Sequence, residues 1–152
     1  MYQYFAKHMG RRFYGKLNEH DYEWIVRRYA EHMPLGHTHE GHDALGGTRH
    51  SSAAAGRWFQ RLFTLIPTLH VDIKEVVAKG WPWHVVVVTE WVASGTCADG
   101  QPYHDEGVQV VHVKFGRIVG AHWYHDTQRN AEACRRMAQN GIKEAAAPPI
   151  ED

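Results

Sequence analysis

The sequence predicts an α+β fold, in which helices cover one face of an antiparallel sheet. Up to about residue 67, apolar residues recur every three or four positions, as on the buried side of a helix. From about residue 70 to residue 126 they alternate with polar residues, as on a strand with one buried face. The chain has 152 residues, close to the usual size of one domain. We therefore expect a single domain over residues 1–143 and a flexible tail over residues 144–152.

Two helices are predicted near the start of the chain. The first carries an apolar stripe with a spacing of four residues, formed by Phe5, Met9, Phe13 and Leu17. The second follows Asp21, a favoured N-cap residue, and extends to about His32. Pro34 prevents its continuation, because proline lacks the backbone N–H that a helix needs.

The next segment, residues 35–50, has no helical period and contains four glycines. It therefore predicts bends, with at most a short strand over Leu35–His39. Ser51 or Ser52 can cap a third helix, which Pro67 ends. The wide apolar stripe of this helix includes Trp58.

The second half of the chain predicts a meander of four strands, over residues 70–79, 84–94, 101–115 and 118–126. Gly107 is a possible β-bulge, and Gly116-Arg117 is a candidate two-residue turn between the last two strands. Asp126 or Thr127 can then begin a C-terminal helix that stops at Gly141.

Composition narrows the class of partner. Lys and Arg total 17 and match the 17 Asp and Glu residues, so no basic field exists to attract nucleic acid or an anionic membrane. The start of the chain lacks the apolar core of a secretion signal, and the longest aliphatic run is Val85–Val88. We expect a soluble, cytoplasmic protein. Cys97 and Cys134 form no disulfide framework or metal motif, and we interpret them as structural or incidental.

Four segments of the sequence resemble one known family when they occur in this order: LNEHD, ALGGTRHS, ADGQPYHDEGVQVV and FGRIVGAHWYHDTQR. They are similar to the SnoaL-like branch of the nuclear transport factor 2-like (NTF2-like) superfamily, over about residues 5–137. The resemblance implies a cone-shaped fold, with helices packed on a curved antiparallel sheet. The superfamily includes polyketide cyclases, ketosteroid isomerases, dehydratases and members without catalysis, so the fold does not select the function.

The register of the last hairpin decides which residues face the interior. A turn at Gly116-Arg117 would place Phe115 opposite Ile118, Val111 opposite His122 and Gln109 opposite Tyr124. The other face of the strand carries Lys114, and burying its charge would cost more free energy than leaving it in water. We therefore expect the face with Phe115, Val111 and Gln109 to point inward. A bulge in the hairpin would slip one strand by one residue and exchange its faces.

Asp126 is the expected catalytic acid or base, because burial at the mouth of an apolar cone would raise its pKa. His122 and Tyr124 would position or polarise a substrate oxygen, and Gln109 could donate to a carbonyl. Asp126 can also be simply the N-cap of the last helix. Because cyclases of the resembled family use a histidine and an aspartate on the last two strands, His112 is a second choice as the partner of Asp126.

The other expected substrate-binding residues are Tyr14, His39, Trp58, Trp91 and Val111. At the positions that align with the ketosteroid isomerase residues this chain has Phe13, Val111 and Thr38, so steroid isomerisation is not expected, although Tyr14 adjoins Phe13.

A cluster of histidines offers a further alternative. His37, His39 and His42 could provide three nitrogens for zinc or a similar metal. We favour a histidine at the pocket rim instead, with no metal and no cofactor.

The sequence thus predicts a pocket enzyme that performs cofactor-free acid/base chemistry on an apolar, oxygenated molecule such as a polyketide, by cyclisation, isomerisation or dehydration. The alternative is a non-catalytic ligand-binding or dimerisation protein. The expected partners are a small-molecule ligand and a second copy of the chain. We expect the two copies to meet through the outer sheet face, with Trp123 in the interface.

Overall fold

A curved sheet of six strands in the order β2-β1-β6-β5-β4-β3 forms one layer of the protein. The computed structural model describes residues 1–152. The elements are α1 (Tyr2–Asn18), α2 (Tyr22–Val26), β1 (His32–His39), β2 (Gly47–Ser51), α3 (Ser52–Leu65), β3 (His70–Trp81), β4 (His84–Thr96), β5 (Pro102–Lys114), β6 (Arg117–His125), α4 (Thr127–Gln139) and the 3₁₀ helix η1 (Lys143–Ala146). The predicted α+β class is confirmed.

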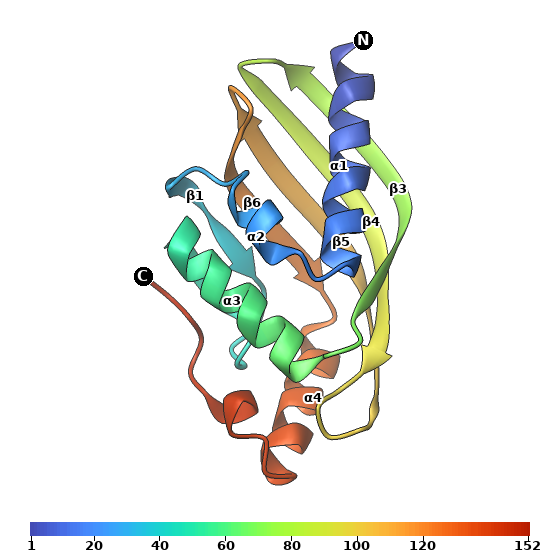
Figure 1. Cartoon of the computed structure of the whole chain (residues 1–152), viewed down its shortest axis with the longest axis vertical. Coiled ribbons are helices and arrows are strands. Elements are labelled where there is room, and N and C mark those ends of the chain that lie inside the picture. The colour runs from blue at the N-terminus through green and yellow to red at the C-terminus, as the bar shows by residue number, and fades with distance from the viewer.

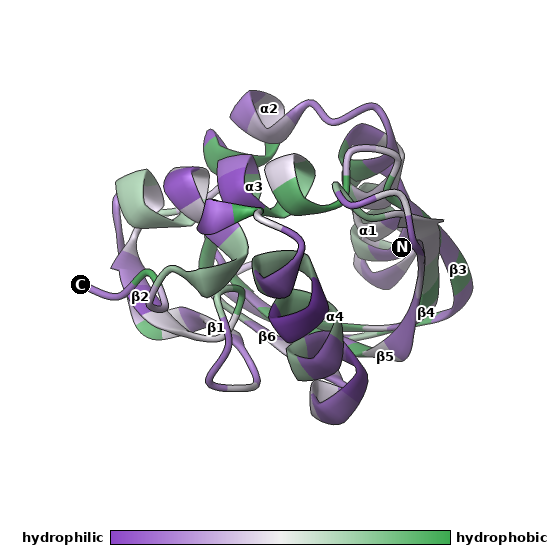
Figure 2. Ribbon diagram, turned by 90° about the horizontal axis from the view of Figure 1, so that it is seen from below, coloured by the Kyte–Doolittle hydropathy of each residue, from purple (hydrophilic) through white to green (hydrophobic).

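The helices lie on the concave side of the sheet. Figures 1 and 2 show α1 inside the curve formed by β3, β4 and β5, and α2 and α3 beside it on the same side. Helix α4 lies at the end of the sheet farthest from the N-terminus (Figure 1). All neighbouring strands are antiparallel except β1 and β6, which are parallel. This arrangement leaves the space between α1 and the sheet as the interior of an open cone.

Side-chain caps begin three of the helices. The side chain of Asp21 accepts a hydrogen bond from the backbone of Trp24, Ser51 caps α3, and Asp126 caps α4 by accepting from the Arg129 N–H at 3.1 Å. Each carboxylate or hydroxyl satisfies a backbone donor that the first helical turn leaves free. No helix is long and apolar enough to cross a membrane.

Helix α2 is much shorter than the sequence predicts, and ends at Val26 instead of about His32. The cause is a competing backbone interaction with the first residues of β6. The Ile118 N–H donates to the carbonyl oxygen of Arg28 at 2.9 Å, and the Ala30 N–H donates to the Ile118 oxygen at 2.8 Å. These backbone groups therefore form a bridge to the sheet and leave the helix.

The predicted register of the last hairpin is wrong. The turn residues are Phe115 and Gly116, with φ of 48° and 77°, and Lys114 pairs with Arg117. A left-handed residue at both turn positions matches the twist of the strands. The register then shifts between His112 and Val113, so that β6 carries one extra residue.

This bulge exchanges the two faces of β6. Val111 pairs with Ala121, Gln109 with Trp123, and Gly107 with His125. Trp123 therefore points into the interior, where it is buried, and not toward the outer face as expected. Gly107 is not a bulge: it pairs regularly with both neighbouring strands, and a Cβ there would lie 1.9 Å from the Tyr124 carbonyl oxygen.

Residues 144–152, expected to form a flexible tail, make specific contacts with the body of the protein. Nε of Arg49 donates to the carbonyl oxygen of Ile150 at 2.9 Å, and Arg61 binds Glu144 and the carbonyl oxygen of Pro148. The carboxylate of Asp152 accepts hydrogen bonds from Ser51. This segment lies against β2 and α3.

Candidate functional site

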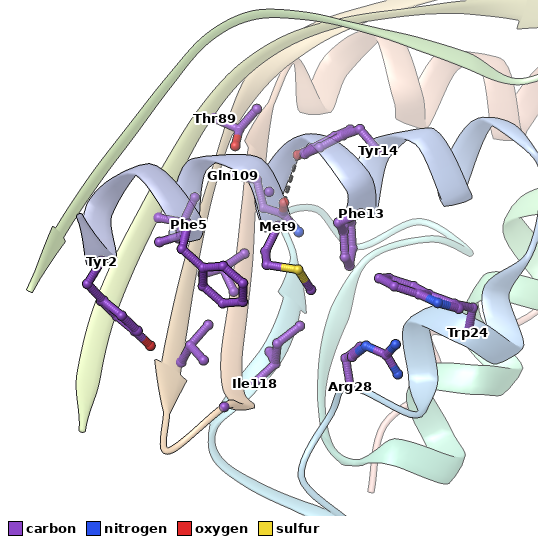
Figure 3. A pocket seen from close by; sticks show the side chains of 16 residues that line it. Tyr2, Phe5, Met9, Phe13, Tyr14, Trp24, Arg28, Thr89, Gln109 and Ile118 are labelled. Carbon is purple, nitrogen blue, oxygen red and sulfur yellow. Dashed lines mark hydrogen bonds between the residues drawn. The ribbon is translucent and has the colours of Figure 1, made fainter. Parts of the chain in front are cut away.

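A pocket of about 270 Å³ lies between α1 and the concave face of the sheet. Figure 3 shows it from close by, with Phe5, Met9 and Phe13 descending from α1 along one wall. The opposite wall is formed by valines of β4 and β5. Its lining residues are Tyr2, Phe5, Ala6, Met9, Gly10, Phe13, Tyr14, Trp24, Arg28, Val87, Thr89, Gln109, Val111, Val113, Gly116 and Ile118. The stripe predicted as the buried face of α1 thus becomes a pocket wall as well.

The polar groups deepest in the pocket come from three different elements. The Tyr14 hydroxyl, on α1, donates to Oε1 of Gln109, on β5, at 2.7 Å. Thr89, on β4, pairs with Gln109 across the two strands. The exposed fractions of Tyr14, Gln109 and Thr89 are 1%, 1% and 2%, so the three groups form a buried polar floor.

The amide nitrogen of Gln109 has no hydrogen-bond partner in the protein, although it is buried. Since Oε1 accepts from Tyr14, the nitrogen is directed to the other side of the amide group, as Figure 3 shows. A buried donor without a partner costs about 1–3 kcal/mol. An unused donor that lines a pocket is therefore a candidate for binding a ligand oxygen.

Burial raises the pKa of Tyr14 well above its ordinary value. The phenol is therefore neutral at physiological pH and keeps its proton for Gln109. The pocket lining contains no Asp, Glu or His side chain. Its only charged group is the guanidinium of Arg28, which stacks on the indole of Trp24 with 4.0 Å between the Cζ atom and the ring centroid.

Aromatic side chains close the deep end of the pocket. The ring centroids of Tyr14 and Trp123 are 6.0 Å apart, and Trp123 in turn contacts Trp58 at 6.4 Å and Trp91 at 5.9 Å. The indole nitrogen of Trp58 donates to the Leu45 carbonyl oxygen at 2.7 Å, which fixes its ring. These indoles separate the pocket from a second group of polar residues.

That second group is built around a buried ion pair. Nδ1 of His125 lies 2.9 Å from Oδ2 of Asp105, and Nε2 lies 2.7 Å from the Glu40 carbonyl oxygen. Because both ring nitrogens face acceptors, the arrangement favours the doubly protonated, positively charged imidazole. Burial opposes this charge, but the hydrogen bond and charge of Asp105 outweigh it and raise the pKa of His125. The ring of His39 lies against that of His125, with centroids 3.9 Å apart and the planes tilted by 32°.

The expected substrate-binding residues fall into two groups. Tyr14, Gln109 and Val111 line the pocket. His39, Trp58 and Trp91 are buried in the interior, outside the pocket lining. His39 is therefore not at the pocket rim.

The expected catalytic residues do not face the pocket. The bulge turns His122 and Tyr124 outward, where their rings stack at 3.9 Å and Tyr124 is 49% exposed. Nε2 of His122 bonds to the Glu40 carboxylate. Asp126 accepts the Arg129 N–H as the helix cap and also contacts the Arg129 guanidinium. His112 bonds to His84, at 3.1 Å.

No three His, Cys, Asp or Glu side chains are placed so that they could hold a metal ion. Nδ1 of His37 contacts the buried guanidinium of Arg49 at 3.1 Å, whereas His42 is exposed. The alternative of a three-histidine site is therefore wrong for this arrangement. Burial lowers the pKa of both His37 and His39 well below the ordinary value, so both are neutral at physiological pH.

Sequence reasoning missed Arg28, Trp24 and Thr89 as pocket residues. The early end of α2 brings Arg28 to the pocket. Thr89 had a usable signal, because it alternates with Val87 and Trp91 on one face of the strand.

Solved structures similar to this chain share its fold. A proposed isomerase from Bacillus subtilis is 19% identical, with a TM-score of 0.66 over 85% of this chain and 93% of that chain. A proposed polyketide cyclase from Xanthomonas campestris is 17% identical, with a TM-score of 0.58 over 92% of this chain and 96% of that chain. TerC, crystallised with polyporic acid, is 17% identical, with a TM-score of 0.61 over 80% of this chain and 91% of that chain. At these identities the likeness concerns the fold alone.

No curated protein matches the chain. The SnoaL-like domain family, in contrast, matches residues 10–121, which include the second half of α1, the pocket floor and most of the sheet. Because this match spans well over half of the chain, the protein belongs to the SnoaL-like domain family.

Proposed function

We propose that this protein binds a compact, mostly apolar molecule whose buried end carries an oxygen atom, and that this oxygen accepts a hydrogen bond from Nε2 of Gln109. The supporting observation is the unpartnered amide nitrogen at the floor of an otherwise apolar pocket. A carbonyl oxygen would satisfy this donor, and the apolar walls would hold the rest of the molecule. The bond from Tyr14 holds the amide in the orientation that this requires.

The size of the pocket limits the ligand. A volume of about 270 Å³ is close to the lower end of the usual range for ligand sites, roughly 300 Å³. It suits a molecule of one or two rings better than an extended chain. The TerC structure with polyporic acid supports small-molecule binding by this fold.

Two naphthalene probes of nearly equal shape test the proposal. 2-Acetylnaphthalene carries a ketone oxygen, and 2-isopropenylnaphthalene has a methylene group in its place. Calorimetric titration of the wild-type protein should give roughly tenfold tighter binding of the ketone, as expected for one buried hydrogen bond. Gln109→Leu should remove this preference while still binding the alkene. Equal affinities of the two probes for the wild type would contradict the proposal.

A second candidate is turnover of the bound molecule, the acid/base chemistry expected from the sequence. The observation that favours it is the donor pair itself, because Gln109 held by Tyr14 would stabilise negative charge that develops on a ketone oxygen. The relatives described as a proposed isomerase and a proposed polyketide cyclase point the same way. The lining offers no carboxylate or imidazole as a base, however, so binding is the better supported function.

Proton exchange separates the two candidates. In D₂O, the methyl protons of 2-acetylnaphthalene exchange only if the ketone enolises, and proton NMR measures the rate. A binding protein should leave the rate as it is in buffer. A rate raised by the wild type and lost in Asp126→Asn or in Asp105→Asn would establish turnover and identify the group that supports it.

A further inference from the structure

Arg28 contributes a guanidinium to the pocket lining at a partly exposed position. Most partly buried arginines here have an acceptor: Arg61 binds Glu144, and Arg136 binds Asp99. Arg28 is half-buried and lines the pocket, yet its side chain has no hydrogen bond or ion pair within the chain.

Two contacts fix the place of Arg28. Its carbonyl oxygen accepts from the Ile118 N–H, which joins its backbone to the start of β6. Its guanidinium lies over the indole of Trp24, at 4.0 Å from the ring centroid. Figure 3 shows the two side chains together at the side of the pocket away from Tyr2. The position of this cation is thus set before any ligand arrives.

The contact with Trp24 uses none of the hydrogen-bond donors of the guanidinium. Trp24 lies on one side of this group, and the N–H groups of the guanidinium have no acceptor within the chain. A guanidinium edge matches the two oxygens of a carboxylate, and apolar surroundings strengthen such a pair. No carboxylate of the chain lines the pocket to compete for Arg28. Arg12, whose Cζ atom lies 5.3 Å from the same indole, adds a second positive charge nearby.

We propose that the ligand carries a carboxylate that pairs with Arg28, so that this residue determines specificity for an acid over its neutral analogues. The inference rests on the proposed function and adds the chemical class of the ligand. Combined with the Gln109 donor and the apolar walls, it describes a compact keto acid. The ketone would lie at the buried floor, the ring system between the valines and α1, and the carboxylate at the mouth.

The test compares 6-acetyl-2-naphthoate with its methyl ester, which has the same rings and ketone but no charge. Titration calorimetry at about pH 7 should show the wild-type protein binding the acid at least about tenfold more tightly than the ester. The preference should fall as NaCl is raised from about 50 mM to about 500 mM.

Variants assign the preference to a residue. Arg28→Gln should bind the two probes with nearly equal affinity, while its affinity for the ester stays close to that of the wild type. Arg28→Lys should keep part of the preference, because it retains the charge but not the planar edge. Arg12→Gln is the matched control, because it removes an exposed guanidinium near the same indole. This variant should keep most of the preference for the acid.

Gln109→Leu distinguishes failure of this inference from failure of the proposed function. This variant should lower the affinity for both probes by a similar factor and leave the preference for the acid intact. Equal binding of acid and ester by the wild type, or a full preference in Arg28→Gln, would overturn the role of Arg28 alone. Absence of binding by both probes would overturn the pocket function and this inference together.

Discussion

The hydroxyl of Tyr14 lies 2.7 Å from Oε1 of Gln109, so one buried hydrogen bond joins helix α1 to the centre of the sheet. The same bond sets the direction of the free amide nitrogen at the pocket floor. Stability and the proposed ligand recognition would therefore depend on the same contact. A change at Tyr14 should be visible in both.

Tyr14→Phe should lower the free energy of unfolding by about 1–3 kcal/mol, because Oε1 of Gln109 would be left buried without a donor. It should also reduce the preference for 2-acetylnaphthalene over 2-isopropenylnaphthalene, since the amide group loses the bond that orients it. Urea denaturation and calorimetry measure the two effects. Tyr4→Phe, the same change on an exposed residue of α1, is the control and should alter neither quantity. Unchanged stability in Tyr14→Phe would show that this bond contributes little.

Acid should destabilise the protein through its buried histidines. Burial lowers the pKa of His37 and His39, so between their folded-state pKa and about 6.5 the unfolded chain binds more protons than the native protein. The contribution of His37 and His39 to stability is present above about pH 6.5 and is lost as the pH falls below this value. His125 acts in the opposite direction: its raised pKa stabilises at low pH, and this is lost as the pH rises through that pKa. Acid removes the contribution of two histidines and restores that of one, so we expect the free energy of unfolding to fall as the pH is lowered.

Denaturation with urea between about pH 7.5 and about pH 5 measures this dependence. The slope of the unfolding free energy against pH reports how many more protons the unfolded chain binds than the native protein. In His39→Phe, which keeps a ring beside Trp58, this difference should decrease by about one proton. The exposed His70 provides the control, because His70→Gln removes a histidine that is already solvated. A slope in His39→Phe equal to that of the wild type would argue against titration of this residue.

Local sequence signals were enough for most of the fold but not for the faces of β6. The caps at Ser51 and Asp126 and the apolar stripe of α1 depend on residues close together in the chain, and all are present. The position of the turn depends on a positive φ at Phe115, and the faces of β6 depend on the bulge between Ile118 and Gly120. One residue of slip then moved Trp123 into the core and His122 to the outside.

The same limit applies to the candidate site. Gln109 was identifiable as an inward polar residue among valines, and its face does not depend on the register of β6. Arg28 was not, because its place depends on a backbone hydrogen bond from Ile118, which lies far away in the sequence. Long-range pairing of this kind leaves no periodic signal.

Asp126 provides a test between a structural and a chemical role. Because asparagine is also a favoured N-cap, Asp126→Asn should change the stability little, whereas Asp126→Ala should cost about 1 kcal/mol. Neither change should affect binding of the ketone probe, since Asp126 does not line the pocket. Thermal denaturation and calorimetry give both readouts. Loss of probe binding or of proton exchange in a stable Asp126→Asn protein would instead support the chemical role expected from the sequence.

The outer face of the sheet remains the expected surface for a homodimer, but its residues differ from those that the sequence predicts. Trp123 is buried inside, but Val88, Val110 and His122 lie side by side on the outer face, and Val77 is 51% exposed. Pairing two copies through this face would remove exposed valine side chains from water.

Sedimentation velocity of the wild-type protein at micromolar concentration should therefore give a dimer. Val110→Lys should give a monomer, because a charge at the centre of the valine surface would be buried without a partner. Arg57→Glu, on the exposed side of α3, changes charge elsewhere and should leave the dimer intact. Circular dichroism of Val110→Lys would verify that the monomer is folded. A wild-type protein that sediments as a monomer would exclude this interface and leave the pocket as the only binding surface proposed for the chain.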